Sequence, residues 1–270
     1  MIIFFVLVLL VSGGMLVSYY LDAYTQQNRY EDLAALRGDA AAISRPVPNA
    51  QADPQAEETQ PPTEPPMVTV TDPETGEPVE LLREFAQLYT MNNDIVGWIT
   101  IPGTVIDYPV MQTPDSQDYY LYRNFDKEDN KRGCLYVREV CDVFAPSDNL
   151  TIYGHHMRDG SMFGQLEKFQ RSTFRDAHPY IYFDTLTEHH TYEIISVFLT
   201  TATVGEGFYY HAFVDAKTPE EFEKFVKTCR RLQLYDTGVT AEYGDKLICL
   251  STCEYSQVNG RLVVVAKRIA

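Results

Sequence analysis

The sequence has no excess of basic residues. Its 270 residues include 22 Lys and Arg against 38 Asp and Glu, so the formal net charge is −16 at pH 7. A protein that binds nucleic acid usually presents a basic face to the phosphates, so this balance argues against a nucleic-acid partner. Residues 1–80 alone carry 3 basic and 12 acidic residues. The acidity of the rest is moderate and is typical of a soluble surface.

Closely spaced cysteine pairs are also absent. The five cysteines are odd in number, and no CxxC occurs among them; they are Cys134, Cys141, Cys229, Cys249 and Cys253. Cys249 and Cys253 are four residues apart in a predicted strand, where side chains at that spacing lie roughly 13 Å apart, too far for a disulfide. We therefore predict free thiols and no disulfide framework.

Charge is missing from the N-terminal segment. Residues 2–20, IIFFVLVLLVSGGMLVSYY, are mostly apolar, and about 20 such residues span a bilayer as a helix. A cleaved signal peptide is the alternative, but the run is long for one and no basic residue precedes it. Tyr19 and Tyr20 lie where interfacial aromatic residues are common. We predict a retained single anchor over residues 1–20, with the body of the protein outside the membrane.

Aromatic residues are missing from residues 41–80, which contain 9 of the 15 prolines and 8 acidic residues. Such a composition cannot bury enough apolar surface to offset the entropy of ordering the chain. Over residues 21–80 we predict a juxtamembrane segment, which could extend the anchor as a short helix over 21–40, and an acidic, proline-rich stalk over 41–80. The stalk would either hold the folded domain away from the membrane or act as a variable spacer.

Residues 81–270 have the pattern of a folded domain. Apolar residues with helical spacing predict a helix over 81–92, and Thr218 with Glu221 forms a capping-box spacing that begins a helix over 218–232. About eight short strands are predicted, at 95–101, 105–111, 134–137, 150–154, 180–184, 191–202, 246–252 and 261–267. Many short strands with few helices predict a closed or nearly closed β-barrel with helical insertions.

Three polar features lie at the ends of predicted strands. LSTC ends with Cys253, YGHHM contains His155 and His156, and Arg261 begins the last strand. A thiol, an imidazole and a guanidinium suit acyl transfer, in which a thiolate attacks a carbonyl, the imidazole moves a proton and the cation stabilises negative charge. From spacing alone an alternative stays open, because most strand cysteines are small buried apolar residues.

Together these segments resemble the sortase family. LICLSTCEYSQVNGRLVVVAKRI resembles the sortase signature, in which TLxTC ends one strand and an Arg begins the next, and YGHHM resembles the family's histidine motif. DIVGWITIPGTVIDYPVMQ, followed by YYLYRNF, resembles the first barrel strands of class B sortases. The resemblance covers about residues 81–270. It implies a mostly β fold, with a closed eight-stranded barrel, an N-terminal helix and a helix inserted before the cysteine strand.

The resemblance implies a role for each matching residue. Cys253 would be the nucleophile, and His155 would be the general acid that protonates the leaving amine. Arg261 would bind the substrate backbone or the oxyanion. His156 is the alternative acid, at a position where the family more often has another polar residue.

The neighbours of the cysteine would shape the site. These are Ser251, Thr252 and Glu254, with the backbone N–H of Glu254 a candidate oxyanion donor by analogy. Cys249 stands where the family's motif begins with threonine, a small change that leaves the nucleophile position intact. No metal or cofactor is predicted. Zinc held by Cys249, Cys253, His155 and His156 is a weaker alternative, because the tight spacing of zinc knuckles is missing.

The implied reaction is transpeptidation. Cys253 would cleave an NPxTx-like sorting motif near the C-terminus of a secreted protein and hold the acyl part as a thioester. The amine of a lipid-linked peptidoglycan precursor would then resolve the thioester, on the outer face of the membrane of a Gram-positive bacterium. Two alternatives remain: a pilus-type sortase that joins pilin subunits through a lysine, and a catalytically inactive tethered barrel that acts as a binding module.

Overall fold

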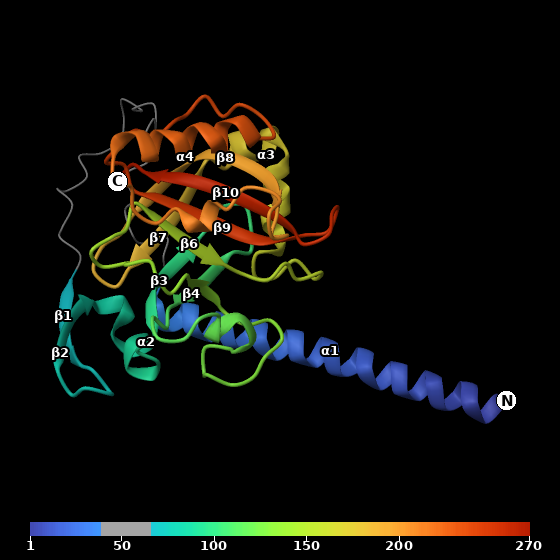
Figure 1. Cartoon of the computed structure of the whole chain (residues 1–270). Coiled ribbons are helices and arrows are strands. Elements are labelled where there is room, and N and C mark those ends of the chain that lie inside the picture. Colours follow the sequence, from blue (N-terminus) through green and yellow to red (C-terminus); the bar gives the residue numbers. More distant parts are fainter. Residues whose placement is uncertain (39–65) are drawn as a thin grey trace, which may run out of the picture.

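A long N-terminal helix leads into a β-barrel (Figure 1). The computed structural model describes residues 1–38 and 66–270. Helix α1 (Ile2–Arg37) includes an apolar stretch long enough to cross a membrane, and its N-terminal end projects away from the barrel. Most of the predicted stalk, residues 39–65, lies outside the described residues.

Eight strands close into a barrel in the order β10-β8-β7-β3-β4-β5-β6-β9. Their bounds are β3 (Ile95–Thr100), β4 (Asp107–Met111), β5 (Leu135–Val137), β6 (Asn149–Tyr153), β7 (Tyr180–Thr185), β8 (Thr191–Thr201), β9 (Leu247–Glu254) and β10 (Gly260–Arg268). Strands β4 and β5 pair in parallel, and so do β6 and β9, while the other barrel neighbours are antiparallel. The predicted eight-stranded barrel is confirmed, and the parallel pairing brings the C-terminal ends of β6 and β9 side by side.

Short helices and one hairpin complete the chain. They are β1 (Met67–Thr71), β2 (Pro78–Leu82), η2 (Arg83–Phe85), α2 (Ala86–Met91), η3 (Tyr119–Tyr122), η4 (Gly164–Gln170), α3 (Ser172–Ala177), η5 (Tyr210–Ala212) and α4 (Pro219–Leu232). The predicted capping of the inserted helix is confirmed, since Thr218 Oγ1 accepts a hydrogen bond from the Glu221 N–H at 3.4 Å. Helix α4 lies across the outside of β8 and buries Phe222 and Phe225 (Figure 1).

The prediction of a helix over 81–92 was wrong at its beginning. Leu81 and Leu82 belong to β2, which pairs antiparallel with β1. The hairpin turn is built by Asp72, whose carboxylate Oδ1 accepts hydrogen bonds from the N–H groups of Glu74 and Thr75 at 2.9 and 2.8 Å. Leu81, Leu82, Phe85, Leu88 and Tyr89 of this stretch are buried, but the first two lie on a strand, because pairing with β1 outweighs the helical spacing.

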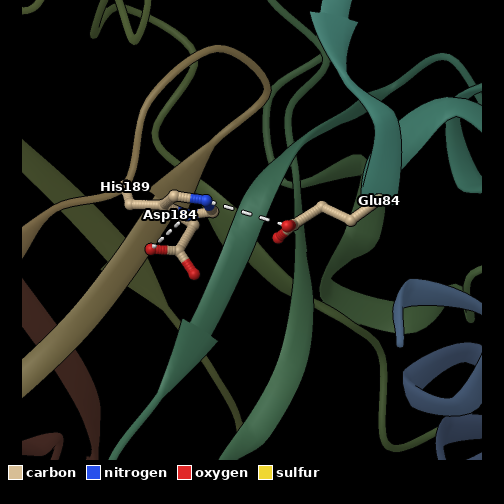
Figure 2. A group of neighbouring side chains, drawn as sticks. All are labelled: Glu84, Asp184 and His189. Atoms are coloured by element: carbon tan, nitrogen blue, oxygen red, sulfur yellow. Dashed lines mark ion pairs between the residues drawn. The ribbon is translucent and has the colours of Figure 1, made fainter. Parts of the chain in front are cut away.

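The end of α1 is fixed to the barrel by a cluster of charged residues. Arg37 Nη2 lies 3.1 Å from Glu84 Oε1 and also pairs with the buried carboxylate of Asp184. His189 Nδ1 lies 3.3 Å from Asp184, and Figure 2 shows Glu84, Asp184 and His189 turned toward one another. The Arg37 guanidinium also lies 5.3 Å from the centre of the Trp98 ring. The cluster therefore anchors the helix end by both charge and stacking.

The rest of the second half of α1 is docked as well. Leu33 is fully buried, and the Tyr30 hydroxyl donates a hydrogen bond to the Gly133 carbonyl at 3.0 Å. Residues 22–37 therefore belong to the folded body. The same helix, α1, therefore carries the apolar segment and contacts the barrel.

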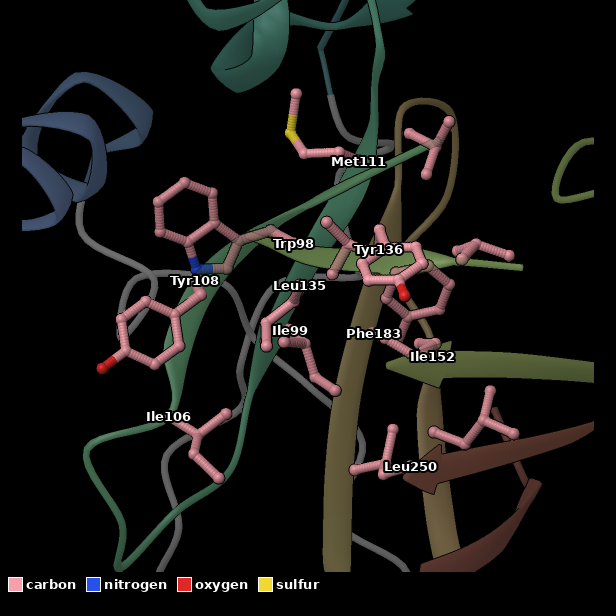
Figure 3. Packing of buried hydrophobic residues seen from close by; sticks show 14 of the residues in the cluster. Trp98, Ile99, Ile106, Tyr108, Met111, Leu135, Tyr136, Ile152, Phe183 and Leu250 are labelled. Carbon is pink, nitrogen blue, oxygen red and sulfur yellow. The ribbon is translucent and has the colours of Figure 1, made fainter. Parts of the chain in front are cut away.

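The barrel interior is filled by large apolar side chains. Figure 3 shows Trp98, Ile99, Leu135, Phe183 and Leu250 among the buried side chains of the barrel strands, with the neighbours Trp98 and Ile99 on opposite faces of β3. Each is buried, and burial of one such side chain contributes roughly 1.5–3 kcal/mol. This packed interior makes the strands a rigid support for the side chains at their ends.

Candidate active site

A cleft of about 400 Å³ opens where β6, β9 and β10 meet the loops at one end of the barrel. All three residues predicted to carry the chemistry line it: His155, Cys253 and Arg261. Ser251 and Thr252 line it too. Residues from three separate motifs of the sequence thus share one concave surface.

Cys253 is the only one of the five cysteines that is not buried, and all five are free. Burial raises the pKa of the Cys134 thiol to about 12, and it also raises the pKa of Cys141, Cys229 and Cys249. Thiolates are the reactive form of cysteine. The four buried cysteines are therefore unsuited to nucleophilic attack, whereas Cys253 faces the cleft.

Arg261 lies directly opposite Cys253 in the antiparallel pairing of β10 with β9. Residues that face each other across such a pair project on the same side of the sheet, with Cβ atoms roughly 4.5–5.5 Å apart. The Arg261 Nη1 donates to the carbonyl of Gly260 at 2.9 Å, which holds the guanidinium at the rim of the cleft. The register of two strands therefore fixes a cation beside the thiol.

His155 follows β6 and is oriented by a carbonyl from another part of the chain. Its Nε2 lies 2.7 Å from the carbonyl oxygen of Leu121, so Nε2 carries the proton and donates it. The Tyr122 ring lies 5.5 Å from the imidazole, centre to centre. This leaves Nδ1 as the nitrogen that can exchange a proton with a bound substrate. In the part of the chain that the structure describes, no hydrogen bond joins His155 to Cys253.

Gly154 positions His155 against the cysteine strand. Its N–H donates to the Ser251 carbonyl at 3.2 Å, and its carbonyl accepts from the Thr252 hydroxyl at 2.7 Å. A Cβ at this position would lie 2.3 Å from Leu135 Cδ2, inside the packed barrel. A larger residue would have to displace the buried Leu135 and Phe163 side chains, which gives a physical reason for the Gly-His sequence of this motif. Thr252, the residue before Cys253, thereby ties the cysteine strand to the histidine loop.

His156 points to a different partner from His155. Its Nδ1 donates to the backbone carbonyl of Cys253 at 2.9 Å, and its Nε2 lies 3.5 Å from the Glu167 carboxylate. Its ring is 5.1 Å from that of Tyr255, whose hydroxyl donates to the His156 carbonyl at 3.1 Å. His156 thus braces the backbone of the cysteine strand.

Glu254 is the last residue of β9 and pairs with Gly260. Its carboxylate accepts hydrogen bonds from the N–H and the hydroxyl of Ser256, at 2.9 and 2.6 Å. These contacts hold the turn that leads from β9 to β10. The oxyanion role of its backbone N–H stays a prediction.

The cleft contains residues that the motifs did not reveal. The Tyr210 hydroxyl is hydrogen-bonded to Ser251 Oγ at 2.5 Å, and burial raises the pKa of Tyr210 to about 12. Arg138 donates to the carbonyl of His211, and burial, together with Arg138 and Arg261, lowers the pKa of the His211 imidazole. These residues come from loops far away in sequence. No local pattern of the sequence marks them.

One group of side chains brings three possible metal-ligand atoms close together. The ligand atoms of Glu84, Asp184 and His189 lie within 4.8 Å of one another (Figure 2). Arg37 already supplies the positive charge that both carboxylates face, so the group acts as an ion-pair network. The residues weighed as zinc ligands, Cys249 with the cleft residues, do not form such a group within the described residues.

All comparisons with known proteins match the same family. The Sortase domain family model matches residues 99–269. Sortase B of Listeria monocytogenes is 34% identical over 199 residues, covering 70% of this chain and 76% of that protein. Sortase B of Staphylococcus aureus is 31% identical over 188 residues, covering 69% of this chain and 75% of that protein.

Solved structures agree with these relatives. Sortase B from B. anthracis in complex with AAEK1 has a TM-score of 0.70 and 29% identity, covering 93% of this chain and 99% of that chain. The Staphylococcus aureus sortase B–substrate complex has a TM-score of 0.64 and 30% identity, covering 70% and 86%. A sortase B complexed with triglycine has a TM-score of 0.63 and 30% identity, covering 69% and 85%.

Proposed function

The chain belongs to the sortase family and is a class B cysteine transpeptidase, and we propose that Cys253, His155 and Arg261 carry its reaction. The observation that supports this assignment most directly is the strand register. It sets Arg261 opposite Cys253, the one cysteine that is not buried, in a cleft that His155 also lines.

The first half-reaction breaks a peptide bond. The Cys253 thiolate attacks the carbonyl carbon of the bond to be cleaved, and the carbonyl oxygen becomes an oxyanion beside Arg261. When the intermediate collapses, the carbon–nitrogen bond breaks and protonated His155 gives its proton to the leaving amine. The acyl part of the substrate then remains on Cys253 as a thioester.

The second half-reaction forms a new peptide bond. An acceptor amine attacks the thioester carbon while neutral His155 takes up a proton from the attacking nitrogen. The carbon–sulfur bond breaks, and Cys253 leaves as a thiolate. The enzyme therefore returns to its starting state, and no net oxidation or reduction occurs.

Beyond the general reaction of the family, we also propose a donor and an acceptor. The donor is a secreted protein with an NPxTx-like sorting motif, and the acceptor is the amine of a lipid-linked peptidoglycan precursor. Among the relatives, one solved sortase B holds a substrate and another holds triglycine, a peptide that ends in an amine as the acceptor would.

The location that we propose is the outer face of a cell membrane. Residues 1–20 form the anchor, residues 21–80 the segment that joins it to the barrel, and residues 81–270 the catalytic domain. The apolar half of α1 supports the anchor. A secreted donor would meet the cleft only on the outer side.

Peptide cleavage by wild type and Cys253→Ala tests the nucleophile. We expect the wild type to cleave an NPxTx peptide and to form a thioester adduct that mass spectrometry locates on Cys253. The alanine variant should fold normally and cleave nothing. Cys249→Ala is the matched control, because it removes a buried thiol from the same strand and should keep activity. Cleavage by Cys253→Ala would place the nucleophile elsewhere.

The same assay with two histidine variants tests the acid. We expect His155→Asn to lose nearly all turnover, since general acid catalysis contributes about 10²–10⁴-fold. His156→Asn should keep most of it, because an Asn amide can still donate to the Cys253 carbonyl. The opposite ranking would make His156 the acid.

Incubation of the enzyme with pilin subunits tests the acceptor. If the enzyme joined the subunits into ladders in place of using a peptidoglycan acceptor, the acceptor proposal would fail.

A further inference from the structure

We propose that Arg132 is a positioning residue that joins helix α1 to the loop carrying His155, so that the membrane-anchored helix helps to arrange the active site. This inference rests on the proposed role of His155. The bridge lies outside the cleft, and it involves none of the residues that line the cleft.

Arg132 is a buried cation with partners on the histidine loop. Its side chain is only 3% exposed. The Nη1 group donates to the Asp159 carboxylate at 2.5 Å and to the Ser161 hydroxyl at 2.9 Å. Burial alone would raise the pKa of Asp159, but hydrogen bonds from Ser161 and Arg132 lower it below its ordinary value. Asp159 is therefore held as a carboxylate against the guanidinium.

The opposite side of Arg132 contacts α1. Its Nε lies 3.4 Å from the Asp22 carboxylate, and its guanidinium lies 5.4 Å from the centre of the Tyr19 ring. Asn130 donates to the other Asp22 oxygen at 3.3 Å. Tyr19 and Asp22 lie at the end of the apolar segment. The Arg132 guanidinium therefore bridges the membrane-proximal turn of α1 and the histidine loop.

The loop transmits this contact to His155 because its two arms are paired. The Phe163 N–H donates to the His155 carbonyl at 3.0 Å, and His156 forms a β-bridge with Met162. Asp159 and Ser161 lie at the tip between these arms. A hollow of about 320 Å³ lies between the loop tip and α1, so apolar packing does not fill the space around the bridge. The polar bridge is therefore a main contact that holds the loop tip against α1.

The test compares Arg132→Met with Arg29→Met in the full chain, purified in detergent micelles. Arg29 is the control, because it joins α1 to Asp126 in the loop between η3 and β5, at a more exposed ion pair, and, among the described residues, has no ion pair with the histidine loop. We expect Arg132→Met to lower kcat roughly tenfold, a fraction of the 10²–10⁴-fold that a correctly placed acid contributes, with little change in KM. Arg29→Met should keep kcat within about twofold.

Three further measurements separate positioning from general destabilisation. Arg132→Lys should recover part of kcat, because a single cation can still reach Asp159 without the planar fork. Asp159→Asn, which removes the charge at the loop tip, should lower kcat as Arg132→Met does. The rate of labelling of Cys253 by a thiol reagent should change much less than kcat in every variant, because the loop contacts the Cys253 backbone, through His156, and not its thiol.

Equal losses of kcat in Arg132→Met and Arg29→Met would overturn the inference, as would an unchanged kcat in Asp159→Asn. Should Arg132→Met not fold, the Asp159→Asn result decides alone. This outcome can be told apart from a failure of the proposed function. Activity of Cys253→Ala would refute the proposed function. Loss of activity in Cys253→Ala together with normal activity of Arg132→Met would refute only the role of the bridge.

Discussion

At the scale of single residues, Cys253 differs from the other four cysteines in its surroundings. Cys249, four residues earlier on the same strand, is fully buried, and its thiol pKa is raised by burial. Cys253 lies where β9 reaches the cleft, opposite Arg261. Residue type alone cannot distinguish these two thiols. Their exposure and their cross-strand partners do.

Arg261 carries the prediction that belongs to this scale. Replacing it with Ala should lower kcat by roughly 10²–10³-fold, the typical loss when one oxyanion donor is removed. Lys should recover only part, because an ammonium lacks the fixed fork of the guanidinium. Arg268→Ala, at the other end of the same strand, is the control and should change little. Similar losses in both variants would argue against a role of Arg261 at the site.

At the scale of secondary structure, the parallel pairing of β6 with β9 brings the two main motifs together. Tyr153 pairs with Ser251, so the residues that follow β6 meet the end of the cysteine strand. The sequence indicates both strands but not which strands are neighbours. Local patterns carry no information on pairing between segments nearly 100 residues apart, and closure of the barrel decides it.

Gly154 tests this junction. Gly154→Ala should reduce turnover several-fold or more, because the added Cβ would lie 2.3 Å from Leu135 Cδ2 and 2.7 Å from a Phe163 ring atom and would displace His155. The double variant Gly154→Ala/Leu135→Ala removes the shortest of these contacts but leaves the Phe163 ring, so it should regain part of the activity, although the shortened core residue lowers stability. Steady-state kinetics with thermal unfolding of all variants checks both effects. A fully active single variant would show that the junction tolerates displacement.

At the scale of the whole molecule, helix α1 and the barrel form one body. Helix α1 runs through Arg37, in line with the helical extension expected over residues 21–40, and its charged end docks on Glu84 and Asp184. The composition of residues 41–80 predicts a spacer, yet most of the hairpin of β1 and β2 falls within this range. Averaged composition hides such local order, because a few alternating β-branched residues and one Asp-built turn are enough to form a hairpin.

Global stability should depend on pH through His190, which is buried beside β7 and β8. Burial is the main cause that lowers the pKa of its imidazole to about 4. Below a pH of about 6.5 the unfolded chain therefore binds a proton that the folded chain does not, and stability falls as the pH drops from there toward 4. Between pH 7 and pH 5, the free energy of unfolding measured with urea should decrease less for His190→Gln than for wild type. His178→Gln is a control histidine, and an equal decrease in all three proteins would contradict this role.

The sequence by itself determined the class of the barrel, the apolar N-terminal segment, the capped helix α4 and the candidate reactive residues, because these depend on local composition, periodicity and motif. The tertiary structure alone decided which groups meet: Arg261 with Cys253 through strand register, His156 with the Cys253 carbonyl, and Arg132 with both α1 and the histidine loop. Such contacts join segments up to about 110 residues apart, and only the closed packing of the chain specifies them.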